Sequence, residues 1–178
     1  MLDDLFELSR IENGSFDLRR EVLDLLDPVS DAREVAAQRG IRIQQRGIEG
    51  STHFGDVGPL TRAVSTLLAH GIRHAPNGSK IQISATTRDD GKLVSGILEN
   101  GIGVLTENLR RMFEVGWIGD AASTTESGYG VPSGAGLELA IARGIVQAHG
   151  GDVNVRSVDG GFCLDIILSF HESGPSAS

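Results

Sequence analysis

Residues 60–76 read LTRAVSTLLAHGIRHAP and carry the strongest helical periodicity in the chain. Their apolar side chains recur at the spacing of one buried helix face, at Leu60, Val64, Leu67, Leu68 and Ile72. We expect this helix to end at Pro76-Asn77-Gly78. Its last turn carries Arg73 and His74, and the pattern leaves open whether these side chains stabilise the helix end or contact a ligand.

Downstream of this helix, alternating apolar and polar residues predict strands over residues 80–88 and 92–99, with Asp89-Asp90-Gly91 as the turn between them. The second strand runs into residues 99–103, ENGIG. The two glycines let the backbone approach a flat ligand, and the carboxylate of Glu99 can accept hydrogen bonds from an amino group. An ordinary strand-to-helix turn has the same composition, so this motif alone assigns no site.

A third motif, residues 134–140 with the sequence GAGLELA, opens a predicted helix over residues 135–149. Small residues at a helix start leave backbone N–H groups free to face an anion, which the helix dipole also favours. Between the last two motifs we expect a short helix over residues 106–113 and a long glycine-rich loop over residues 115–133. Such loops often carry function.

Upstream, residues 2–11 predict a short amphipathic helix whose apolar residues are Leu2, Leu5, Phe6, Leu8 and Ile11. So short a helix must pack on the domain or on another chain. Strands are expected over residues 19–25, 41–46 and 52–54. Asp27-Pro28 predicts the start of a helix, with Asp27 as the cap and a buried stripe at Val29, Ala32, Val35 and Ala36.

Two last strands are expected over residues 152–157 and 161–170, joined by a turn at Asp159-Gly160. Strands thus alternate with helices, and several strands follow one another through tight turns. This order predicts an α+β fold, a two-layer α/β sandwich with a mixed, mostly antiparallel sheet and helices on one face.

The composition narrows the classes of function. A net charge of -8 without a basic cluster argues against binding to nucleic acid or to anionic lipid. No apolar run approaches the ~20 residues that span a bilayer. The one cysteine, Cys163, lies among apolar residues and is expected to be a buried thiol. We therefore expect a cytoplasmic protein with no direct membrane contact.

In this order the three motifs resemble the ATP-binding catalytic domain of sensor histidine kinases, in the superfamily that also contains type II topoisomerase and heat-shock ATPases. The resemblance runs from about Leu2 to Phe170. Residues 60–76 look like the N box, 99–103 like the first glycine box, 112–114 like the F box, 134–140 like the second glycine box and 149–151 like the turn after the last helix.

Residues 5–14 look like the end of the second dimerisation helix of these kinases. The resemblance therefore implies a helix end and linker over residues 1–14, a catalytic domain over residues 15–171 and a disordered tail over residues 172–178. The other ATPases of the superfamily lack this helix. A relative that phosphorylates serine is disfavoured for the same reason.

The resemblance implies a role for each matching residue. Glu99 would face the adenine amino group, His74 would lie against the adenine ring and Arg73 would reach the phosphates. Backbone groups would complete the pocket for ATP and Mg²⁺ at Gly101, Gly103, Gly134, Gly136 and Leu137. Residues 115–133 would be the ATP lid. The reaction would be transfer of the γ-phosphoryl group to a histidine, catalysed mainly by positioning and charge stabilisation.

Several ligand-facing residues differ from the family pattern. His70 stands where the family has an asparagine that binds magnesium, so the catalytic and metal-binding role at this position falls to an imidazole. Glu99 replaces an aspartate, and Glu138 replaces a glycine where its charge would oppose the phosphates. Thr66 and Gly71 also differ from the usual asparagine and alanine.

None of the five histidines has the sequence context of the family's phosphoacceptor. The resemblance thus implies an acceptor and dimerisation domain in cis or on another chain, a response regulator downstream, and a system that can be membrane-anchored. A homodimer through residues 2–12 is a further expectation. The substitutions leave an alternative, a degenerate pseudokinase that acts as a protein-interaction module without turnover.

Overall fold

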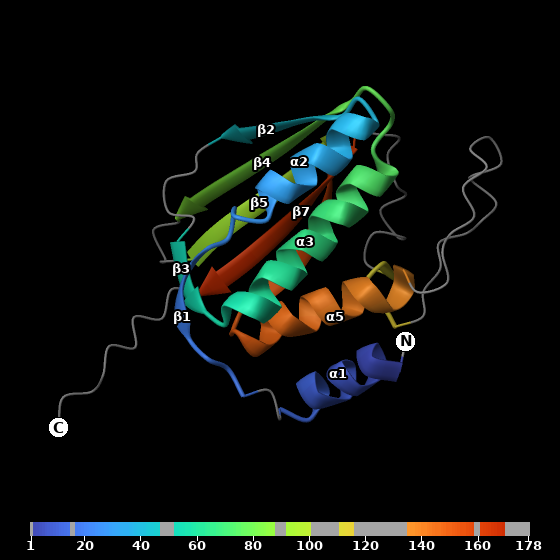
Figure 1. Ribbon diagram of the computed structural model, residues 1–178. Coiled ribbons are helices and arrows are strands. Elements are labelled where there is room, and N and C mark those ends of the chain that lie inside the picture. Colours follow the sequence, from blue (N-terminus) through green and yellow to red (C-terminus); the bar gives the residue numbers. More distant parts are fainter. Residues whose placement is uncertain are drawn as a thin grey trace.

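The computed structural model describes residues 2–14, 17–46, 52–87, 92–100, 111–115, 135–158 and 161–169 (Figure 1). In chain order the elements are α1 (Leu2–Glu12), β1 (Glu21–Asp24), α2 (Val29–Gln38), β2 (Arg42–Arg46), β3 (Thr52–Gly55), α3 (Val57–His74), β4 (Lys80–Thr87), β5 (Lys92–Asn100), α5 (Ala135–Ala148), β6 (Asp152–Val158) and β7 (Gly161–Ser169). Most of the short helix predicted over residues 106–113 lies outside the described residues.

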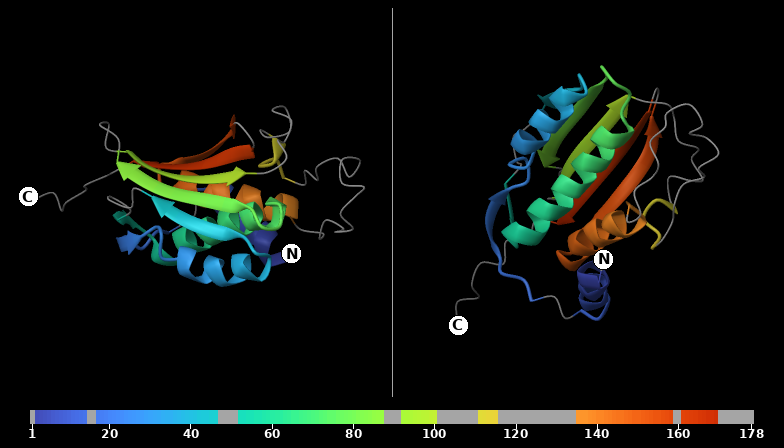
Figure 2. Two further views of the ribbon diagram at one scale, coloured as in Figure 1. Left: turned by 90° about the horizontal axis from the view of Figure 1, so that it is seen from above. Right: turned by 45° about the vertical axis from the view of Figure 1, so that its right-hand side comes forward.

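The main sheet has five strands in the order β2-β4-β5-β7-β6. β2 pairs with β4 in parallel, and the other neighbours are antiparallel. Figure 2 shows the helices gathered on one face of this sheet, which confirms the predicted two-layer sandwich. β1 and β3 instead pair with each other as a separate antiparallel ribbon, which the sequence pattern had not distinguished from the main sheet.

The core lies between the sheet and the α3–α5 pair. All five apolar residues of the predicted α3 stripe are buried, and β4 contributes Ile81, Ile83 and Ala85 from alternate positions. At the turn after α5 the backbone is packed so closely that a Cβ atom on Gly151 would lie 2.2 Å from the carbonyl oxygen of Ile167. This glycine is required by close packing against β7.

The start and the stripe of α2 differ from the prediction. Pro28 is the N-cap and Val29 the first helical residue, and no side chain caps this end, so Asp27 does not have the predicted role. Val35 is 54% exposed, so its placement in the buried stripe was wrong. At 100° per residue Val35 lies to one side of the line through Val29 and Ala36, which face the core. The strand predicted over residues 19–25 is confined to Glu21–Asp24.

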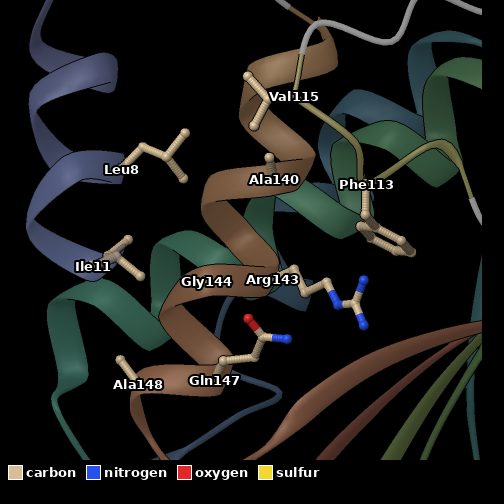
Figure 3. Close-up of a pocket in the computed structure, with 9 residues that line it drawn as sticks. All are labelled: Leu8, Ile11, Phe113, Val115, Ala140, Arg143, Gly144, Gln147 and Ala148. Carbon is tan, nitrogen blue, oxygen red and sulfur yellow. The ribbon is translucent and has the colours of Figure 1, made fainter. Parts of the chain in front are cut away.

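α1 packs on α5, which is one of the two outcomes expected for this helix. Leu8 and Ile11 point from α1 toward α5 (Figure 3). A Cβ atom on Gly144 would lie 2.9 Å from Cγ2 of Ile11, so the glycine permits the close approach of the two helices. Beside them lies an open groove of about 380 Å³. Phe6 remains 74% exposed, so α1 is only partly covered.

None of the helices in the described ranges is both long enough and apolar enough to cross a membrane.

Candidate functional site

The end of α3 and the start of α5 lie toward the same end of the domain, where the two helices spread apart (Figure 1) and the side chains of Arg73 and Glu138 approach each other. After α3 the chain enters β4 at Lys80, and the next residue, Ile81, is in register with Glu99 near the end of β5. α5 runs antiparallel to α3 (Figure 1) and leads into β6, an edge strand of the main sheet. The fold therefore brings the described residues of the three motifs to the same end of the molecule.

His70 and His74 occupy successive turns of α3, with ring centroids 4.4 Å apart and planes tilted by 44°. Burial, followed by the charges of the neighbouring His74 and Arg73, lowers the pKa of His70 to about 3. Loss of hydration also lowers the pKa of His74, followed by the charges of Arg73 and Arg39. Both rings are therefore neutral at neutral pH, a state suited to lying against a flat, uncharged ligand ring.

Arg73 and Glu138 form an ion pair between the last turn of α3 and the first turn of α5. Nη2 of Arg73 lies 3.9 Å from Oε2 of Glu138, and the two side chains are 40% and 55% exposed. An exposed pair at this distance contributes no more than about 1 kcal/mol. An anion that binds here can therefore replace Glu138 as the partner of Arg73 with little loss of free energy.

Of the remaining residues predicted to bind nucleotide, some lie within the described part of the chain and others do not. Gly136 and Leu137 lie in the first turn of α5, where backbone N–H groups have no acceptor within the helix. The side chain of Leu137 packs, partly buried, against the core. Glu99 lies between Ile81 of β4 and Phe162 of β7 in strand register. The predicted positions Gly101, Gly103 and Gly134, and nearly all of the predicted lid, fall outside the described residues.

The surroundings of His70 do not fit magnesium. Its neighbours His74 and Arg73 offer ring nitrogens and a positive charge, whereas Mg²⁺ requires oxygen ligands in octahedral geometry. Within the described ranges, no group of three or more histidine, cysteine, aspartate or glutamate side chains could hold a metal ion. A metal-binding role for His70 stays a prediction.

A second histidine pair lies at the opposite end of α3 and α5. His53 of β3 and His149, directly after α5, are 4% and 7% exposed. Nδ1–H of His149 donates to the carbonyl of Ile145 at 2.7 Å, and Nε2 accepts from the N–H of Asp56 at 3.0 Å. These two bonds fix one neutral tautomer. The Asp56 carboxylate also accepts the N–H of Arg19 at 3.0 Å, which ties the segment before β1 to this end of the domain.

Two arginines that the sequence patterns did not single out support these elements. Arg143 of α5 makes two hydrogen bonds to Asp152 at 2.9 and 3.2 Å, and its guanidinium lies 5.6 Å from the centroid of the Phe113 ring (Figure 3). Arg39 donates to the backbone at the end of α3. Its place directly before Gly40, which ends α2, was the one signal that the sequence offered.

Comparison with known families agrees with this arrangement. The profile of the histidine kinase-, DNA gyrase B- and HSP90-like ATPases matches residues 55–172, which include α3, α5 and the main sheet from β4 onward. The catalytic histidine kinase fold is also found in solved structures. The histidine kinase AdeS of Acinetobacter baumannii superposes with a TM-score of 0.72 at 20% identity, over 96% of this chain and 77% of that one.

The chain is similar to curated sensor kinases over nearly its whole length. It is 31% identical over 173 residues to the signal transduction histidine-protein kinase BaeS of Escherichia coli K12, covering 94% of this chain and 36% of the relative. It is 30% identical over 164 residues to the sensor-like histidine kinase SenX3 of Mycolicibacterium smegmatis, covering 90% of this chain and 41% of the relative. The chain thus spans less than half the length of these relatives. It belongs to the histidine kinase-, DNA gyrase B- and HSP90-like ATPase family and, within it, is similar to sensor histidine kinases.

Proposed function

We propose that this chain binds ATP between the end of α3 and the start of α5 and transfers the γ-phosphoryl group to a histidine of a separate acceptor segment. The observation that carries the proposal is the ion pair between Arg73, which precedes His74 at the end of α3, and Glu138 in the first turn of α5, in a chain that belongs to an ATPase family. The acceptor would be supplied in cis or by another chain. The phosphoryl group would then pass to a response regulator.

Adenine binding falls to groups that are uncharged or that accept hydrogen bonds. The neutral ring of His74 offers a face for the adenine ring, and its low pKa keeps it neutral while Arg73 stands beside it. Glu99, one methylene longer than the family's aspartate, would accept a hydrogen bond from the exocyclic amino group. Specificity for adenine would rest on this carboxylate.

Phosphate binding falls to Arg73 and to the N-terminal amides of α5. Free amides and the helix dipole favour an anion there, and a guanidinium can bind phosphate oxygens through two parallel hydrogen bonds. Glu138 competes for Arg73, but their long, exposed contact is weak, so nucleotide phosphates can displace it. Glu138 thus lowers affinity for ATP and still permits binding.

No catalytic step is assigned to magnesium, because the side chains beside His70 do not fit this ion. Catalysis is assigned to positioning and to charge stabilisation by Arg73. The non-catalytic alternative rests on the substitutions at His70, Glu99 and Glu138 alone, and nothing in the described part of the chain favours it.

Calorimetry with ATP, ADP and AMP tests the binding part of this proposal. We expect weak binding that falls from ATP to AMP as phosphates are lost, and weaker binding still in Arg73→Gln. Arg62→Gln, in the second turn of the same helix, where Arg62 pairs with Glu7 of α1, is the control and should bind as the parent does. Equal affinity of parent and Arg73→Gln for ATP would contradict the placement of the phosphates.

Phosphoryl transfer is tested with ATP labelled at the γ position and a histidine kinase acceptor domain supplied in trans. We expect label on the acceptor that is stable in base and lost in acid, as a phosphohistidine is. No label under conditions where ATP binding is saturated would reject the transferase proposal.

The homodimer through residues 2–12 also remains a proposal, supported by the exposed Phe6 of α1. Sedimentation of the parent and of Phe6→Ser tests it. A monomeric parent would reject it.

A further inference from the structure

Arg39, at the end of α2, forms hydrogen bonds with the end of α3. It is the C-cap residue of α2, and its guanidinium reaches the backbone groups with which α3 ends. Nη1 donates to the carbonyls of Ile72 and Arg73, the latter at 3.0 Å, and Nη2 donates to the carbonyl of Ala75 at 3.0 Å. Nε donates to the side-chain oxygen of Asn77 at 3.2 Å.

The three backbone acceptors, on Ile72, Arg73 and Ala75, are carbonyls that a helix end leaves without a partner inside the helix. A positive charge at this end is also favoured by the helix dipole. The backbone of Arg39 adds a further link, because its carbonyl accepts the N–H of Gly78 at 3.2 Å. One residue therefore fixes the last turn of α3 and the loop that leads into β4.

We propose that Arg39 is a positioning residue for the nucleotide: it orders the last turn of α3 so that Arg73 and His74 are held in place to contact the ligand. This inference rests on the proposed function, in which ATP contacts Arg73 and His74 in this turn. The carbonyl of Arg73 is itself an acceptor of Arg39, so loss of the guanidinium frees the backbone of the residue proposed to bind phosphate.

The bonding pattern requires arginine. Three nitrogens of one planar fork donate to four acceptors, from residues 72 to 77. A lysine would keep the positive charge but concentrates its donors at one point and cannot span them. Arg39 and Arg73 also help to hold the pKa of His74 low, while His70 lies against its ring. Loss of the forked guanidinium of Arg39 should release the end of α3, whereas loss of its positive charge should raise the pKa of His74, so the two effects can be measured separately.

The test compares Arg39→Lys and Arg39→Gln with the matched pair Arg33→Lys and Arg33→Gln. Arg33 lies on the same helix, and its guanidinium donates to Gln45 of β2, away from α3. ATP affinity is measured by calorimetry at a temperature where circular dichroism shows every variant folded. Both Arg39 variants should bind ATP at least about tenfold more weakly than the parent, the loss expected for hydrogen bonds from a charged group. Both Arg33 variants should match the parent.

Two readouts report on the turn without ATP. The amide of Ala75, which donates to the carbonyl of Gly71 at 3.0 Å, should exchange faster with solvent in both Arg39 variants. The pKa of His74, followed by NMR, should rise more in Arg39→Gln than in Arg39→Lys. Parental ATP affinity in the folded Arg39 variants would overturn the proposal. If the parent itself binds no ATP, the proposed function fails, and unchanged Ala75 exchange would then overturn the inference about Arg39 separately.

Discussion

Two histidines lie at each end of the antiparallel pair α3 and α5, and the two pairs are held in different ways. At one end, His149 is fixed between the Ile145 carbonyl and the Asp56 amide, and His53 is buried beside it. At the other end, the rings of His70 and His74 lie 4.4 Å apart. No hydrogen bond from another described residue is found on either of these two rings.

The same difference holds for the ion pairs at the two ends of α5. Arg143 and Asp152 form two hydrogen bonds at 2.9 and 3.2 Å, whereas Arg73 and Glu138 approach only to 3.9 Å. The end at which His149, Arg143 and Asp152 are hydrogen-bonded, called the saturated end below, stabilises the fold, although Nδ1 of His53 has no partner there in the described structure. Among the described residues, the other end has polar groups that a ligand can engage without first breaking strong contacts, and this supports the proposal that the nucleotide binds there.

The largest effect is expected at the saturated end, from Gly151→Ala. The added Cβ would lie 2.2 Å from the carbonyl oxygen of Ile167, and backbone on both sides must move to relieve the clash. We expect the free energy of unfolding to fall by about 3 kcal/mol. Urea unfolding measures the change.

Gly58→Ala is the control, because no atom lies within 4 Å of the added Cβ and the residue is in the exposed first turn of α3. It should lie within about 0.5 kcal/mol of the parent or be slightly stabilised. A Gly151→Ala variant as stable as this control would show that the saturated end tolerates an added atom.

The second effect is a loss of stability in acid that depends on His53. Burial, then the charges of His149 and Arg20, lower its pKa from 6.5 to about 4. Between these values the unfolded chain binds a proton that the folded chain does not. The contribution of neutral His53 to the free energy of unfolding is therefore fully present above pH 6.5 and is lost as the pH decreases toward 4. The free energy of unfolding falls by about 3 kcal/mol once the unfolded chain has taken up the proton.

His53→Leu isolates this contribution. Nδ1 of His53 is buried without a hydrogen-bond partner in the described structure, so an apolar side chain removes a polar group that gains nothing from burial. The variant should show a flatter dependence of unfolding free energy on pH between 6.5 and 4. An unchanged slope would show that His53 is not the group that titrates.

The sequence predicted the elements that depend on apolar spacing and turns, and it could not predict contacts between distant side chains. The α3 stripe and the β4–β5 hairpin follow from local periodicity, and both are confirmed. Val35 was misplaced because periodicity does not reveal how wide a face α2 presents to the core. Arg39 and Arg143 were missed because their partners lie on other elements. The roles of His70, His74 and Glu99 came from resemblance and remain predictions.

A smaller effect is expected at the open end, on affinity. Glu138→Gly removes a negative charge close to where phosphates would bind and frees Arg73. An exposed charge a few ångströms away changes the binding energy by about 1 kcal/mol, so ATP should bind about fivefold tighter. His70→Asn should add a dependence on magnesium, because an amide oxygen replaces an imidazole.

Calorimetry of the parent, both single variants and the double variant, with and without magnesium, measures these changes. Tight magnesium-dependent binding by the parent would show that neither substitution weakens the site.

The smallest effect concerns the stability contributed by the two ion pairs of α5. Glu138→Gln should change the free energy of unfolding by no more than about 0.5 kcal/mol, because its partner is distant and exposed. Asp152→Asn should cost about 1 kcal/mol, since it weakens a two-bond contact with Arg143. If urea titrations showed the same loss of unfolding free energy in Glu138→Gln and Asp152→Asn, the proposed difference between the two ends of α5 would be wrong.

The placement of the nucleotide is tested most directly by following the imidazole resonances of His53, His70, His74 and His149 by NMR while ATP is added, with assignments from single substitutions. We predict saturable shifts at His70 and His74, and stationary resonances at His53 and His149. Equal shifts at both pairs, or saturation of ATP binding with shifts at His53 and His149 only, would contradict a site between the end of α3 and the start of α5.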